Sequence, residues 1–114
     1  MKSIVYSPEY REGILDLREY LIREFGENTA KKVIREITDK IHLLEKNENL
    51  GSSLKAVYGI ETDYRYIFAA HNYIFYRYDK QNIYIINLYN ERVDFIRKLF
   101  KTDTLSESSL LDTY

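Results

Sequence analysis

Apolar residues in the first part of the chain recur at the spacing of amphipathic helices. Ser7 and Pro8 are typical of a helix start, because a serine hydroxyl caps a free backbone N–H and proline lacks the N–H that would stay unpaired there. Gly26 favours a helix end, and a second helix is expected from Asn28 or Thr29. Two amphipathic helices with so short a connection predict an antiparallel hairpin. The first stripe is Tyr10, Ile14, Leu17 and Leu21; the second is Ala30, Val33, Ile34, Ile37, Ile41 and Leu44.

The pattern changes to alternation after residue 63. Three strands are predicted at residues 64–69, 73–78 and 83–89, with hairpin turns at residues 70–72 and 79–82. A short strand is expected at Ser3–Tyr6, a loop at residues 47–53, an extended segment at residues 54–58, and a last helix at residues 92–100. The predicted class is α+β in the order β-α-α-β-β-β-α, with the helical hairpin packed on an antiparallel sheet.

Both faces of the predicted strands carry apolar or aromatic residues. In the first strand Tyr64, Tyr66 and Phe68 lie opposite Arg65, Ile67 and Ala69. In the third strand, strict alternation sets Ile83, Ile85 and Tyr89 on one face and Ile86 and Leu88 on the other. A sheet with one face in water is normally polar there, so we expect the second face to be covered or to bind a partner.

Composition limits the alternatives. The chain of 114 residues has the size of one domain, and it has no cysteine, which excludes disulfides, thiolate zinc sites and a cysteine nucleophile. The formal charge of −1 gives no general attraction to nucleic acid. No apolar run has the length of a membrane span or signal peptide, so we expect a cytoplasmic protein, complete from its first residue, that binds no membrane.

Several short motifs follow one another along the chain: VYSPE (residues 5–9), YLIREFG (20–26), NENLG (47–51), Tyr64-Arg65, Phe75-Tyr76-Arg77, and RVDF (92–95) with Leu99-Phe100. In this order and spacing they resemble those of the RelE/ParE superfamily of toxins from type II toxin–antitoxin pairs. The resemblance covers about residues 2–100, which we therefore take as a RelE/ParE-like toxin domain. Residues 101–114 form a polar tail that we expect to be mobile, although Leu105, Leu110 and Leu111 offer docking groups.

The resemblance implies a growth-inhibiting toxin with a cognate antitoxin protein, often serving plasmid stabilisation, and two possible targets. RelE-like members cut messenger RNA on the ribosome without a metal, and ParE-like members poison DNA gyrase. A metal-independent endoribonuclease needs a base, an acid and a cation at the phosphate. A different alternative is a non-catalytic or degenerate toxin fold that only pairs with an antitoxin. No cofactor and no metal are expected, since His42 and His71 lack ligand spacing.

Five residues are the candidates for a site by this resemblance. Arg65 matches the sheet arginine, Arg92 the arginine after the last strand, and Lys55 a loop lysine; Arg77 is a further binding candidate. Tyr89 is the candidate proton-transfer residue, because Phe95 stands where an acid is expected and cannot transfer a proton. Glu61 is a possible base. Arg65 and Arg77 are equally explained as strand arginines that pair with Glu61 or Asp79, and Tyr89 is equally explained as a tyrosine at the edge of the core.

Overall fold

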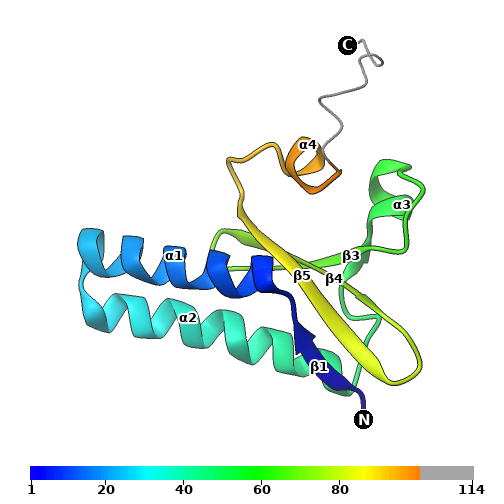
Figure 1. The fold of residues 1–114 in the computed structure, drawn as a ribbon, viewed down its shortest axis with the longest axis horizontal. Helices are drawn as coiled ribbons and strands as arrows, with labels where there is room; N and C mark the ends of the chain where they lie inside the picture. Colours follow the sequence, from blue (N-terminus) through cyan, green and yellow to red (C-terminus); the bar gives the residue numbers. More distant parts are fainter. Residues whose placement is uncertain (101–114) are drawn as a thin grey trace.

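The computed structural model describes residues 1–100, and the predictions for residues 101–114, including Leu105, Leu110 and Leu111, lie outside this part. Helices and strands follow the predicted class (Figure 1). The elements are β1 (Ser3–Tyr6), α1 (Pro8–Phe25), α2 (Glu27–His42), the 3-10 turn η1 (Leu43–Glu45), β2 (Ser52–Ser53), α3 (Leu54–Tyr58), β3 (Arg65–Ala69), β4 (Asn72–Tyr78), β5 (Asn82–Asn90) and α4 (Phe95–Phe100).

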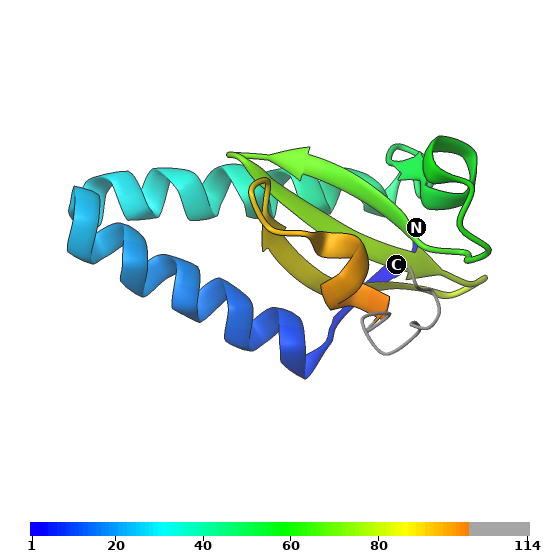
Figure 2. The same cartoon turned by 90° about the horizontal axis from the view of Figure 1, so that it is seen from above.

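The five strands form one sheet in the order β1-β5-β4-β3-β2. The predicted meander of β3, β4 and β5 is antiparallel, and β1 pairs in parallel with β5. The hairpin of α1 and α2 lies on one face of the sheet and α4 lies on the other, while the tip of the hairpin projects beyond the strands (Figures 1 and 2). The parallel β1–β5 pair is what lets the chain enter α1 directly above the sheet.

Two predicted elements were wrong in detail. Residues 54–58 form a helix instead of an extended segment, because the Ser53 hydroxyl accepts a hydrogen bond from Ala56 N at 3.2 Å and Gly59 ends the helix at φ 71°. The last helix begins at Phe95 and not at Arg92, which lies in the turn before it. Phe95, Ile96, Leu99 and Phe100 of this helix pack on the sheet, and Phe95 is the most buried of them.

The start of α1 is fixed by Ser7, as its sequence predicted. The Ser7 hydroxyl accepts a hydrogen bond from Tyr10 N at 2.9 Å and donates one to Ile86 O at 2.5 Å. One side chain therefore caps the helix and ties it to β5.

The hairpin-side core lies between α1, α2 and the sheet. It contains residues from every long element, which explains why both helical stripes are apolar. Its buried residues are Tyr10, Ile37, Ile41, Leu44, Ile67, Ala69, Ile74, Tyr76, Ile83, Ile85 and Leu88.

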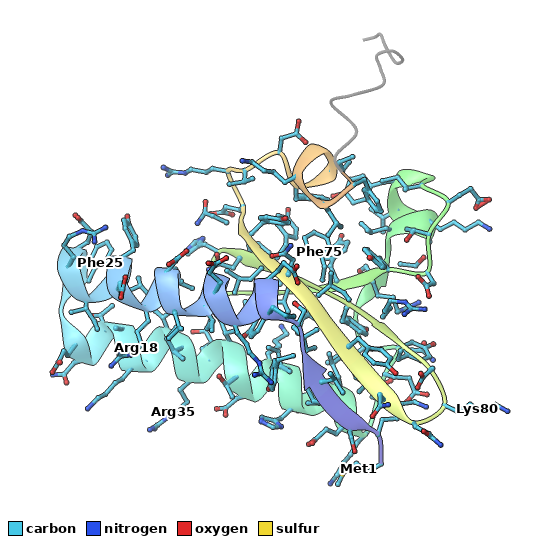
Figure 3. All side chains as sticks on the ribbon, in the orientation of Figure 1. Met1, Arg18, Phe25, Arg35, Phe75 and Lys80 are labelled. Atoms are coloured by element: carbon cyan, nitrogen blue, oxygen red, sulfur yellow. The ribbon has the colours of Figure 1, made fainter. Side chains whose placement is uncertain are left out.

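The opposite face holds a second cluster, the aromatic-face core, which confirms that this face is covered. It is built on Leu54, Phe75 and Phe95, with α3 and α4 placed over it (Figure 3). The Phe95 ring centroid lies 4.8 Å from that of Tyr73 and 5.1 Å from that of Phe75. Partly buried members are Tyr64, Tyr66, Tyr73, Ile86, Tyr89, Ile96, Leu99 and Phe100.

A β-bulge changes the facing of the last strand. Phe75 pairs with Asn87 and Tyr76 with Ile85, so Ile86 is an extra residue in β5. Leu88 therefore joins Ile85 in the hairpin-side core, and Tyr89 joins the aromatic-face core. Strict alternation had assigned both residues to the wrong faces, because a bulge has no signal in the apolar pattern.

Candidate functional site

The Arg65 side chain forms hydrogen bonds that stabilise the fold. Its Nη2 donates hydrogen bonds to Gly51 O at 2.7 Å and to Asn49 O at 3.3 Å. Its buried Nε has no hydrogen-bond partner among the described residues. The guanidinium thus holds the loop before β2 against the sheet, and its donors point at backbone carbonyls.

Tyr76 completes this loop clamp, which we define as Arg65, Tyr76 and the backbone of residues 48–51. The Tyr76 hydroxyl accepts a hydrogen bond from Gly51 N at 2.9 Å and donates one to Glu48 O at 2.8 Å. Burial raises the pKa of Tyr76, and the bond from Gly51 and the nearby Arg65 oppose that rise. A Cβ at position 51 would lie 2.4 Å from Tyr66 O, so only glycine fits under the clamp.

Lys55 and Arg77 each have an acidic partner. Lys55 Nζ lies 3.0 Å from Glu61 Oε2, which brings the candidate cation and the possible base into one exposed ion pair. Arg77 Nε donates to Asp63 Oδ2 at 3.0 Å, and this bond raises the pKa of Arg77. The Arg77 guanidinium also lies over the Tyr84 ring, 5.8 Å from its centroid.

Tyr89 packs inside the aromatic-face core. Its hydroxyl accepts a hydrogen bond from Asn87 Nδ2 at 2.9 Å, and its ring centroid lies 6.0 Å from that of Phe75. Burial raises the pKa of Tyr89, which keeps the phenol protonated. Phe95, at the position where an acid was expected, is a buried core residue.

The structure does not gather the candidates of the sequence into one cluster. Arg65 pairs with Tyr76 of β4. Asn90, two residues before Arg92, pairs with Asn72, which lies four residues before Tyr76 in β4. Four strand residues span about 13 Å of backbone. Among residues 1–100, no hydrogen bond joins the Arg65 side chain to Tyr89 or Arg92. Arg65 also lies on the hairpin side of the sheet, and Tyr89 on the other side.

A groove lies where the tip of the hairpin overhangs the sheet. Its volume is about 720 Å³. Tyr20 and Phe25 on its helical wall are 47% and 60% exposed, although both are large apolar side chains. α1, with 18 residues, spans about 27 Å, and its C-terminal end projects with the start of α2 beyond the strands (Figure 1). The groove is lined by Asp16, Leu17, Tyr20, Leu21, Phe25, Thr29, Val33, Ala70, His71, Asn72, Asn90, Glu91 and Arg92.

The β3–β4 turn forms the opposite wall of the groove. Ala70 and His71 have φ of 50° and 66°, a left-handed conformation that non-glycine residues adopt at a cost. His71 Nδ1 lies 2.7 Å from Glu91 Oε2, and Glu91 N donates to His71 O at 2.9 Å. These contacts hold the strained turn against the segment that follows β5.

Sequence reasoning missed this groove, although it named Arg92 at its rim. The signal was present, because Tyr20 and Phe25 are large apolar residues outside the first stripe. Within residues 1–100, no group of three or more His, Asp or Glu side chains is placed to hold a metal ion. No helix in this part of the chain is long and apolar enough to cross a membrane.

Comparison with known proteins gives one family. A sequence profile described as "ParE toxin of type II toxin-antitoxin system, parDE" matches residues 4–95. A solved structure described as "Chromosomal ParDE TA system from P. aeruginosa" is similar to this fold, with a TM-score of 0.66 and 15% identity over 79% of this chain and 96% of that one. No curated protein sequence matches the chain.

Proposed function

The chain belongs to the ParE toxin family of type II toxin–antitoxin systems, and from this premise we propose that it arrests growth by binding DNA gyrase in the cytoplasm, without cutting messenger RNA. The choice of target rests on one observation. The side chains that could perform ribonuclease chemistry lie apart from one another or are bonded to other groups of the protein. Arg65 donates to backbone carbonyls, and Lys55 is paired with Glu61. Tyr89 lies on the other face of the sheet from Arg65.

A cleavage mechanism would need a base at the ribose 2′-hydroxyl and an acid at the leaving oxygen, both within about 3 Å of their protons. The candidate phenol for proton transfer is Tyr89, and burial raises its pKa. Such a phenol is a poor base at neutral pH. The arrangement favours a toxin that works by occupying its target.

The partner that this family implies is an antitoxin protein, and we assign its docking to the groove. A helix with an apolar ridge fits a groove walled by exposed Tyr20 and Phe25 and floored by buried Leu21. The free toxin would leave these side chains in water. We therefore expect poor solubility of the toxin alone and a marked gain on co-expression with the antitoxin encoded beside it.

The proposal is tested by brief induction of the toxin in cells. Primer extension on a reporter messenger RNA and the topology of a plasmid are read from the same culture. We expect intact messenger RNA together with cleaved or relaxed plasmid DNA. Discrete cuts within translated codons, with plasmid topology unchanged, would show that the target is the ribosome. Unimpaired growth on induction would contradict the toxin proposal altogether.

A further inference from the structure

We propose that Asp16 and Arg92, on opposite walls of the groove, select the antitoxin by charge. The helix they accept has an apolar ridge, a basic residue on the flank that meets Asp16 and an acidic residue on the flank that meets Arg92. This inference rests on the proposed function, because it concerns the partner of the same groove. It gives Arg92 a role in recognition instead of phosphate binding.

Both side chains carry charges that the fold leaves available. Among residues 1–100, no ion pair involves Asp16 or Arg92. The other acidic residue of the groove, Glu91, is engaged by His71 Nδ1 at 2.7 Å. Within the described part of the chain, the α1 wall therefore presents the unpaired carboxylate of Asp16, and the turn wall presents the unpaired guanidinium of Arg92 beside the Glu91 carboxylate that is bonded to His71.

The position of Asp16 explains how the charge pair sets orientation. Asp16 and Tyr20 are four residues apart on α1 and therefore lie on one side of that helix, next to the apolar floor at Leu17 and Leu21. Arg92 approaches from the segment after β5. A helix laid between the two walls in the reverse direction, or rotated about its axis, would bring like charges together. Like-charge contacts at an interface reject wrong partners more strongly than matched charges increase affinity.

Hydrogen bonds hold the backbone of the turn wall in place. Glu91 N donates to His71 O, and Arg92 N donates to Asn90 Oδ1 at 3.0 Å, so the backbone that carries Arg92 is fixed on both sides. A charge on a fixed backbone discriminates partners better than one on a loose segment, since less ordering is needed on binding.

The test uses the full chain and the antitoxin encoded beside it, both purified, with binding measured by surface plasmon resonance at several salt concentrations. The variants are Asp16→Lys and Arg92→Glu, with the milder Asp16→Asn and Arg92→Gln. Matched controls are Asp39→Lys and Arg35→Glu, which reverse exposed charges on α2 outside the groove. Circular dichroism and melting temperature establish that each variant is folded.

We expect each reversal in the groove to weaken binding about 10-fold, mainly through the association rate and less at high salt, and each neutralisation to weaken it about 3-fold. The controls are expected to change binding less than about 2-fold. An antitoxin carrying the opposite charge at one position is expected to restore binding to Arg92→Glu. Equal effects of groove and control reversals would overturn the inference, as would a self-associated dimer of the toxin that occupies the groove. If the natural toxin and antitoxin do not bind each other, the proposed antitoxin docking fails, and this result is distinct from a failure of the charge selection.

Discussion

The loop clamp gives the most specific prediction for stability, through removal of a single hydroxyl. Tyr76→Phe deletes an oxygen that accepts from Gly51 N and donates to Glu48 O, on a side chain that is 0% exposed. The phenylalanine ring fills nearly the same space, so the change in free energy of unfolding reports the two hydrogen bonds.

The magnitude follows from what each partner loses. Gly51 N is buried and would have no acceptor in the variant, which costs about 1–3 kcal/mol. Glu48 O is only partly buried and can accept a hydrogen bond from water instead. We expect a loss of about 2–3 kcal/mol in the free energy of unfolding, or roughly 10 °C in melting temperature for a domain of this size. Urea unfolding followed by circular dichroism at about 222 nm measures it, with an unchanged dependence on urea concentration.

Tyr78→Phe is the matched control. It removes a hydroxyl that donates to Asn49 Oδ1 in the same loop, but this bond is exposed. We expect a loss of less than about 1 kcal/mol there. If the Tyr76→Phe protein were as stable as Tyr78→Phe or more stable, the reasoning would be refuted, because the clamp would not hold the loop.

Three further changes test the fold at other points. Phe95→Ala is expected to cost about 3–4 kcal/mol in urea unfolding, since its ring packs in the aromatic-face core; a cost under about 1 kcal/mol would show that α4 does not cover that face. Ser7→Ala is expected to cost about 1–2 kcal/mol through loss of the α1 cap, and Ser7→Thr, which retains the hydroxyl, is expected to cost less. Hydrogen bonds from Asn82 N and Gln81 N lower the pKa of Asp79, so its stabilising effect is present above its ordinary pKa and is lost as pH falls through the lower folded value. The stability difference between the natural chain and Asp79→Ala is therefore expected to shrink as the pH falls below the ordinary pKa of an aspartate carboxyl, and a difference that stays constant would contradict this assignment.

Most of the fold could be predicted from the chain, because the apolar pattern is regular where packing is regular. The stripes of α1 and α2 and the three long strands were confirmed in order. The errors fall where one local contact overrides the pattern. Ser53 caps a helix in a segment that reads as extended, and the extra residue Ile86 moves Leu88 to the hairpin side.

The site was harder to predict, because side-chain function depends on partners that are distant in the chain. Nothing in the sequence near Arg65 indicates that Gly51 O will take its donors, 14 residues away. Arg92 was named for a plausible reason, yet its surroundings include Asp16 and Tyr20 from a helix more than seventy residues earlier. The overhang of the hairpin tip depends on where α1 packs along β5, and only the tertiary structure shows that placement.

The central claim is that this toxin acts on DNA gyrase by binding, and a reconstituted assay tests it most directly. The toxin, released from its antitoxin and refolded, is added to purified DNA gyrase with relaxed plasmid, and in parallel to a purified translation system with labelled messenger RNA. The account predicts loss of supercoiling at near-stoichiometric toxin, reversed by added antitoxin, with the messenger RNA left whole. Uninhibited supercoiling together with codon-specific cleavage of the messenger RNA would contradict it.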